Sequence, residues 1–146
     1  MDVPIAAPIV LVIEHNPDHL ALIQMALGES AVHPHVVAIA QGADALNFLH
    51  QREPYRDAPR PHLILLDFNL PDMDGTTLLQ DLKSTPHLKR IPVIILTTSN
   101  SADEVLQTYT NQGNCYVVKA SDREELLQLI KRLEEFWLGI VTLPQE

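Results

Sequence analysis

The chain has 146 residues, of which 46% are hydrophobic and 20% charged, and these values are typical of one globular domain with a substantial core. Its formal net charge of -9 at pH 7 and the lack of a Lys and Arg cluster argue against direct binding to nucleic acid. Residues 1–4 do not resemble a signal peptide, the apolar runs are much shorter than the ~20 residues of a membrane span, and the single Cys115 cannot form an internal disulfide. We therefore expect a cytoplasmic protein.

Apolar segments with strand character alternate with segments of helical periodicity along the chain. Strand 8–14 comes first, and the helix after it begins at Asn16, which can cap the first turn, and ends near Gly28. Strand 35–39 and helix 44–52 follow. The proline-rich residues 53–61 then predict a surface loop.

The second half of the chain repeats this alternation. Strand 63–67 leads to helix 76–84, and strand 92–97 leads to a helix that opens with a capping box at residues 101–104. Strand 115–119 precedes a helix that opens with a second capping box at residues 121–124. Together the rounds of strand and helix predict an α/β domain whose parallel sheet is covered by helices on both faces.

Polar side chains stand at the carboxyl ends of four predicted strands, namely Glu14 with His15, then Asp67, Thr97 and Lys119. In an open α/β sheet, ligands bind beyond these strand ends, so we expect the side chains to converge. A carboxylate nucleophile, an acidic partner, a hydroxyl and an ammonium are the groups needed to move a phosphoryl group onto an aspartate. The sequence therefore predicts phosphoryl chemistry with Asp67 as the acceptor.

Residues 66–75, Leu-Asp-Phe-Asn-Leu-Pro-Asp-Met-Asp-Gly, resemble the phosphoacceptor segment of response-regulator receiver domains. The resemblance extends to Pro-Val-Ile-Ile-Leu-Thr-Thr at 92–98 and to Tyr-Val-Val-Lys at 116–119. It implies a flavodoxin-like, doubly wound (βα)5 fold with a central five-stranded parallel sheet in strand order 2-1-3-4-5. Residues 1–146 would form a single receiver domain, with 1–7 as an N-terminal arm and 136–146 as a C-terminal extension of the fifth helix.

Two further segments resemble the phytochrome-associated response regulators, which act as stand-alone receivers. They are Ala-Pro-Arg-Pro at 58–61 and Phe-Trp-Leu-Gly-Ile-Val-Thr-Leu-Pro at 136–144. This resemblance implies a phosphorelay in which a sensor histidine kinase, a phytochrome, is the phosphodonor and the output is a contact with another protein. The chain would be no enzyme but a phosphoacceptor that assists its own phosphorylation and dephosphorylation.

The resemblance also implies a role for each side chain of the site. Asp67 would attack the phosphohistidine of the kinase, and Lys119 would pair first with the acceptor carboxylate and then with a phosphoryl oxygen. The Thr97 hydroxyl would bind another phosphoryl oxygen, and Tyr116 would follow Thr97 inward as part of a switch. A small phosphatase-like enzyme is disfavoured, because the sequence has no glycine-rich phosphate loop.

The expected metal site departs from the family pattern at His15. The resemblance implies Mg²⁺ bound by Asp67, by the backbone carbonyl of Asn69 and, through water, by Glu14, but receivers usually have an acid where this chain has His15. Because Mg²⁺ strongly prefers oxygen ligands, an imidazole there should weaken its binding. Three hypotheses stay open: weakened but working phosphorylation, a non-phosphorylated pseudo-receiver that serves as a dimeric interaction module, and a transition metal such as Mn²⁺ that accepts His15.

The apolar stripe of the last helix continues past the point where receivers normally stop. Phe136, Trp137, Ile140 and Leu143 are the residues that one small domain is not expected to bury. We therefore predict a symmetric homodimer through the fourth helix, the fifth strand, the fifth helix and this tail.

Overall fold

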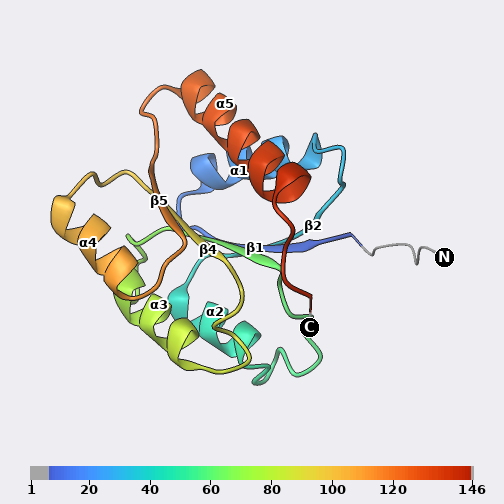
Figure 1. Ribbon diagram of the computed structural model, residues 1–146, viewed down its shortest axis with the longest axis vertical. Coiled ribbons are helices and arrows are strands. Elements are labelled where there is room, and N and C mark those ends of the chain that lie inside the picture. Colours follow the sequence, from blue (N-terminus) through green and yellow to red (C-terminus); the bar gives the residue numbers. More distant parts are fainter. Residues whose placement is uncertain (1–6, 146) are drawn as a thin grey trace.

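The computed structural model describes residues 7–145, which form a parallel sheet between two layers of helices (Figure 1). The strands are β1 (Ile9–Ile13), β2 (His35–Ile39), β3 (Leu63–Leu66), β4 (Val93–Thr97) and β5 (Cys115–Val118). Their order in the five-stranded sheet is β2-β1-β3-β4-β5, which confirms the predicted fold. Apart from Ala7, the predicted N-terminal arm lies outside the described residues.

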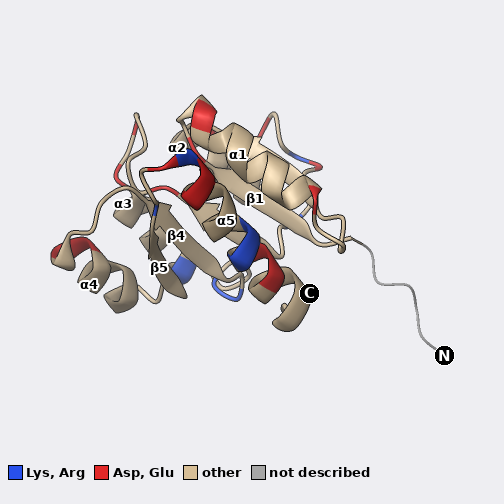
Figure 2. Cartoon of the chain, turned by 90° about the horizontal axis from the view of Figure 1, so that it is seen from above, with Lys and Arg blue, Asp and Glu red and all other residues tan. Residues whose placement is uncertain are grey.

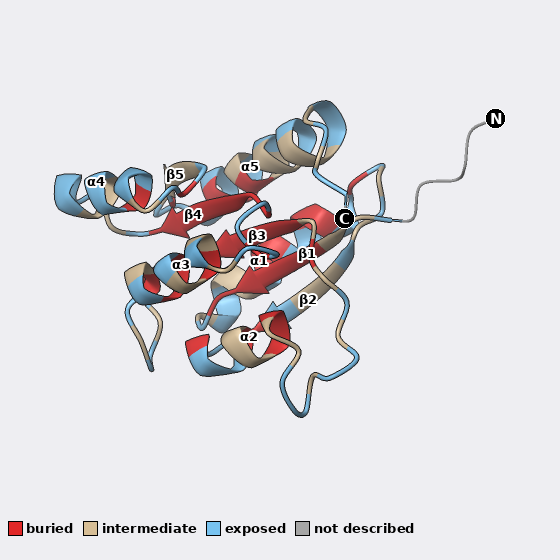
Figure 3. Cartoon of the chain, turned by 60° about the horizontal axis from the view of Figure 1, so that its bottom comes forward, coloured by how far each residue is buried: buried red, intermediate tan, exposed pale blue. Residues whose placement is uncertain are grey.

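Side chains alternate between the two faces of the sheet, and each face has its own hydrophobic core. Leu11 and Ile13 of β1 pack under the helices α2 (Gly42–Leu49) and α3 (Gly75–Ser84). Val10 and Val12 pack under α1 (Pro17–Gly28) and α5 (Arg123–Glu134) on the opposite face. Figure 3 shows that the central strands are buried, whereas the edge strand β2 and the outer faces of the helices are more exposed.

Three predicted strands end one residue earlier than expected, and the reason bears on the site. The backbone N–H groups of Glu14, Asp67 and Lys119 still donate to the neighbouring strands, at 3.1 Å to Ile39, 3.0 Å to Ile13 and 2.7 Å to Thr97. These residues therefore stand just beyond the last paired position. Their backbones are held by the sheet while their side chains face the space beyond its carboxyl edge.

The helix starts agree with the predictions at two places and differ at three, one of which is α3, whose first residue is Gly75 rather than the predicted Thr76. Asn16 caps α1 and Ser101 caps α4 (Ala102–Thr110), as expected. However, α5 is capped by Asp122 and begins one residue later than the predicted box at Ser121. The helix predicted at 44–52 begins at Gly42, because the Asp72 carboxylate from the β3–α3 loop accepts hydrogen bonds from the N–H groups of Gly42 and Ala43 at 2.8 and 2.9 Å.

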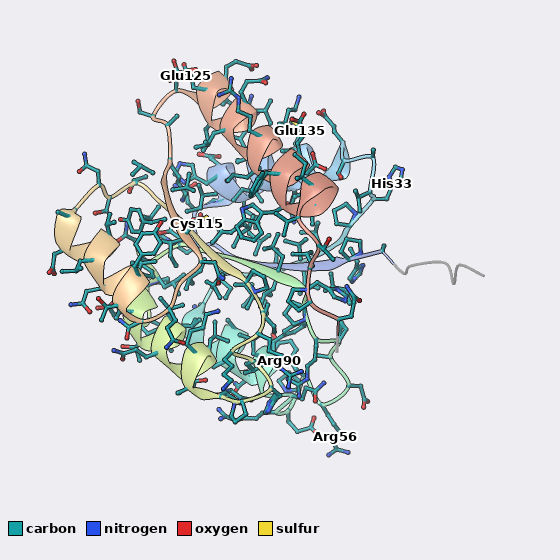
Figure 4. The ribbon with its side chains drawn as sticks, viewed as in Figure 1. His33, Arg56, Arg90, Cys115, Glu125 and Glu135 are labelled. Atoms are coloured by element: carbon teal, nitrogen blue, oxygen red, sulfur yellow. The ribbon has the colours of Figure 1, made fainter. Side chains whose placement is uncertain are left out.

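Of the predicted extension 136–146, the described residues continue the fifth helix only as far as Ile140, and residue 146 lies outside the described part of the chain. The α-helix ends at Glu134 and continues as one π-helical segment, Glu135–Ile140, whose last bond runs from the Val141 N–H to the Phe136 carbonyl at 2.8 Å. In Figure 4, Glu125 is labelled in the first turn of α5 and Glu135 just after its last residue. The chain then leaves the helix and runs back toward the end of the sheet where β1 begins (Figure 1).

Two further features of the backbone concern peptide-bond geometry and helix length. Among residues 7–145, the cis peptide bond joins Glu53 and Pro54, so the bond between Lys119 and Ala120 is trans. Within the same range, no helix is both long and apolar enough to cross a membrane.

Gly75 is required by a close backbone approach at the start of α3. A Cβ atom at this position would lie 2.6 Å from the Cα atom of Phe68, whereas a Cβ at Gly28 would meet nothing within 4 Å. We therefore expect Gly75→Ala to lower the free energy of unfolding by roughly 1–3 kcal/mol through overpacking. The matched variant Gly28→Ala should change it by less than about 1 kcal/mol. Urea denaturation followed by circular dichroism measures both, and equal stabilities of the two variants would contradict this packing account.

Candidate functional site

Four polar side chains meet beyond the carboxyl edge of the sheet, and all of them are buried. Within the described part of the chain, the buried polar and charged residues number six, and four of these form the predicted site: Glu14, Asp67, Thr97 and Lys119. The other acidic residues are spread over loops and helices (Figure 2). Because burial of charged groups is costly unless they are paired, this concentration marks a site rather than ordinary surface.

The Lys119 ammonium connects two carboxylates. Its Nζ atom lies 2.6 Å from Oε2 of Glu14 and 2.8 Å from Oδ2 of Asp67, and both are charge-assisted hydrogen bonds. Although burial opposes ionisation of Asp67, the hydrogen bonds from Lys119 and from the Asn69 backbone hold its pKa below the usual value. Burial raises the pKa of Glu14 despite its bond to Lys119. The Asp67 carboxylate therefore stays ionised, as a nucleophile must.

Asn69 connects Asp67 to β4. Its backbone N–H donates to Oδ1 of Asp67 at 2.9 Å, and its side-chain Nδ2 donates to Oγ1 of Thr97 at 3.1 Å. The predicted acceptor and the predicted hydroxyl are thus held by the same residue. The loop is closed by a backbone bridge between Asn69 and Asp74, and the Asp74 side chain caps α3 through the Thr76 N–H at 2.9 Å.

His15 and His19 lie four residues apart and take different partners. His15 is exposed, and its Nδ1 lies 3.9 Å from Oε1 of Glu14. Glu14, His15 and Asp67 can each offer one ligand atom such that all three atoms lie within 4.8 Å of one another. His19 instead places Nδ1 2.9 Å from Nζ of Lys119.

His19 is the site residue whose contact the sequence does not predict. It lies in the first turn of α1, where burial and then the charge of Lys119 lower its pKa. The signal in the sequence is its place four residues after His15, just past the polar end of the first strand. That spacing suggests a metal pair, and only the three-dimensional arrangement shows that the imidazole faces Lys119.

Tyr116 lies beside the site rather than in it. Its ring packs edge-on against Phe68, which follows Asp67, with the ring centroids 6.2 Å apart. Its hydroxyl donates to the Ser99 carbonyl at 2.7 Å and lies 3.1 Å from Oε2 of Glu104 on α4. Tyr116 therefore contacts both the acceptor loop and α4, which is the position that a switch residue needs.

The four residues predicted to form a dimer interface fall into two groups. Trp137 and Leu143 pack against the hydrophobic core beneath α5 of their own chain. Phe136 and Ile140 are exposed, at 50% and 73%. The tail is therefore partly covered by the chain itself, and only its outer residues are available to a partner.

Comparison with known proteins places these features in a family. The sequence model of one protein family, the response regulator receiver domain, matches residues 10–131 of this chain. Response regulator Rcp1 of Synechocystis sp. (strain ATCC 27184 / PCC 6803 / Kazusa) is 40% identical over 136 residues, which are 93% of this chain and 92% of Rcp1.

Two solved structures are similar along nearly their whole length. The phosphorylated cyanobacterial phytochrome response regulator RcpA is 43% identical with a TM-score of 0.94, covering 96% of this chain and 100% of RcpA. The Mn²⁺-bound form of Rcp1 is 39% identical with a TM-score of 0.93, covering 94% of this chain and 99% of Rcp1. The chain therefore belongs to the response regulator receiver domain family.

Proposed function

We propose that this chain accepts a phosphoryl group on Asp67 from a sensor histidine kinase and signals by contact with another protein. The observation that carries the proposal is the buried Lys119 ammonium, 2.8 Å from the Asp67 carboxylate and 2.6 Å from Glu14. RcpA, named as a phytochrome response regulator, supports a phytochrome as the kinase. Such a chain is a phosphoacceptor rather than a classical enzyme. Its cytoplasmic location stays a prediction from the sequence.

The transfer exchanges one bond to phosphorus for another. An Asp67 carboxylate oxygen bonds to the phosphorus, the bond from phosphorus to the kinase histidine nitrogen breaks, and its electron pair remains on that nitrogen. The charge on the phosphoryl oxygens needs donors that are already in place. Lys119 supplies the ammonium, and the Thr97 hydroxyl, now bonded to Asn69, can turn toward a phosphoryl oxygen. Hydrolysis by water at the same site returns the aspartate.

The charges of the site favour a divalent cation. Two buried carboxylates, Glu14 and Asp67, share a single ammonium, so one negative charge is left without compensation when both are ionised. Asp67, the Asn69 carbonyl and, through water, Glu14 are the groups proposed to hold the ion, which neutralises phosphoryl oxygens when bound. His15 adds an imidazole within reach, which favours Mn²⁺ over Mg²⁺, and the similar Rcp1 has been solved with Mn²⁺.

The pseudo-receiver alternative is not supported by the comparisons, because the similar RcpA is itself phosphorylated. Of the three hypotheses on His15, we therefore propose that phosphorylation works and that the metal site favours Mn²⁺ over Mg²⁺. Tyr116, which contacts both the acceptor loop and α4, would carry the change to the α4–β5–α5 surface.

Intact-mass analysis after incubation with acetyl phosphate and Mn²⁺ tests the acceptor. We expect wild-type protein to gain one phosphoryl group and Asp67→Asn to gain none, because the nucleophilic carboxylate is lost. The matched variant Asp103→Asn, which changes an exposed aspartate on α4, should be modified like wild type. A phosphoryl group retained in Asp67→Asn would rule out Asp67 as the acceptor.

Isothermal titration of His15→Asp tests the metal preference. The added carboxylate should tighten Mg²⁺ binding by about tenfold, because it restores a hard oxygen ligand and a negative charge. Mn²⁺ affinity should change less, since Mn²⁺ accepts both ligand types. The variant His33→Asp places the same charge on an exposed turn and should leave both affinities unchanged. An unchanged Mg²⁺ affinity in His15→Asp would contradict the proposed role of position 15.

We also propose that the chain forms a symmetric homodimer through α4, β5, α5 and the exposed tail residues. Leu106, Tyr109 and Val118 are exposed on α4 and β5, and Phe136 and Ile140 continue the apolar surface. Ile140→Glu should shift the protein toward the monomer in sedimentation velocity, because a buried charge would be left unpaired. Met25→Glu, an equally polar change at an exposed residue of α1, serves as control. A wild-type monomer at high micromolar concentration would refute the dimer.

A further inference from the structure

A cavity of about 410 Å³ lies at the amino edge of the sheet, at the opposite end of the strands from Asp67. Its lining comes from three parts of the chain, which are the residues just before β3, the loop just before β4 and the last described residues of the tail. Small-molecule sites in proteins typically enclose about 300–1,000 Å³. The cavity is therefore large enough for a ligand of modest size.

The titratable side chains that line the cavity are all basic. They are Arg60, His62, His87 and Arg90, and none of the described lining residues is acidic. Two of the 10 Lys and Arg residues and two of the 7 His residues thus gather at one place, in a chain whose formal net charge is -9. A local excess of basic groups on an acidic molecule favours an anionic ligand.

The wall before β3 holds its donors in fixed positions. The Arg60 guanidinium donates to the Leu49 carbonyl at 3.2 Å and to Oε1 of Gln51 at 3.4 Å, which orients its planar fork. His62 is bonded twice to Ile9, because its backbone N–H donates to the Ile9 carbonyl at 2.8 Å and its Nδ1 accepts from the Ile9 N–H at 2.9 Å. A ring whose Nδ1 accepts carries its proton on Nε2, so His62 offers one uncharged N–H donor.

The wall before β4 has a fixed backbone and two side chains that can turn. Nζ of Lys83 donates to the Lys89 and Ile91 carbonyls at 3.2 and 3.0 Å, so the backbone on both sides of Arg90 is held. Figure 4 labels Arg90 in this loop. The side chains of His87 and Arg90 are exposed, and no hydrogen bond or ion pair ties them to another residue of the range 7–145. Both can therefore reorient around an anion without breaking a contact.

Apolar groups give the cavity a second recognition element. Pro61 and Ile91 are buried in its lining, and Pro144 adds an apolar surface from the tail. A free phosphate ion would leave this surface in contact with water, whereas a ligand with an apolar body would cover it. A mostly apolar lining with a few placed polar groups is typical of small-molecule sites.

We propose that this cavity binds a small molecule that carries a phosphate monoester on an apolar body. A phosphate monoester is favoured over a carboxylate because it presents three acceptor oxygens and nearly two negative charges to two guanidinium groups and an imidazole N–H. The site lies apart from Asp67 and involves no transfer chemistry, so the proposal goes beyond phosphoryl acceptance. It gives the chain a ligand input that is separate from its kinase.

Titration of metal-free protein with phenyl phosphate, followed by ¹H–¹⁵N NMR, tests the site. We expect saturable binding with a Kd of about 1 mM or tighter, and amide shifts at Ile9, His62 and Ile91. Inorganic phosphate should bind about fivefold more weakly because it covers no apolar surface. Benzoate should also bind about fivefold more weakly, since it has one charge and two oxygens.

Three results of this titration would overturn the proposal. One is the absence of saturable binding of phenyl phosphate. Another is a set of shifts confined to Asn69 and Lys119, which would place the probe at the acceptor site. The third is an affinity for inorganic phosphate or benzoate equal to that for phenyl phosphate, which would remove the reason for assigning a phosphate on an apolar body.

Arg90→Gln and Lys89→Gln form a matched pair of variants. Both remove one positive charge from an exposed side chain of the same loop, but only Arg90 lines the cavity. Arg90→Gln should weaken phenyl phosphate binding by about tenfold through loss of a charge-assisted contact, and Lys89→Gln should bind like wild type. Equal weakening in both variants would reveal only a general attraction of anions to this surface. That result, or wild-type affinity in Arg90→Gln, overturns the proposal.

Discussion

The buried ion pair between Lys119 and Asp67 is the interaction on which the rest of the site depends. Each group alone would be costly at this burial, and removal of one partner from a buried pair typically costs several kcal/mol. The pair persists because the sheet brings the ends of β3 and β5 to one edge and because Glu14, from the end of β1, accepts a second bond from the same ammonium. Three strands that are distant in sequence are thereby tied at their carboxyl ends.

This arrangement also sets the electrostatic state in which phosphoryl chemistry can begin. Asp67 is kept ionised by donors on both oxygens, Asn69 on one and Lys119 on the other. The side chains packed around the ion pair connect Asp67 to neighbouring segments of the chain. Phe68 follows Asp67 and lies between Gly75 and the ring of Tyr116, so a shift of the loop after Asp67 meets a tight contact on one side and the Tyr116 ring on the other. Interiors packed this closely respond by discrete rearrangement rather than by gradual deformation.

Much of the fold and the polar core of the site could be predicted from the sequence, because both follow from local pattern and a general rule. Continuous apolar runs mark buried parallel strands, and the side chains that end them must share one edge, which brings Asp67 and Lys119 together. The features that could not be predicted depend on contacts between distant segments. Asp72 caps α2 from a loop some thirty residues away, the chain after Glu134 forms a π-helical turn as Trp137 packs against the core, and His19 faces Lys119 instead of joining His15.

The central claim is that the Lys119 ammonium enables Asp67 to accept a phosphoryl group. The most direct measurement is the rate of phosphoryl transfer from a phosphorylated histidine kinase to Lys119→Met, compared with wild type at equal metal saturation and with folding of the variant verified by circular dichroism. The account predicts a rate lower by about a hundredfold or more, as for other preorganised donors to a transition state. Transfer to the variant at the wild-type rate would contradict it.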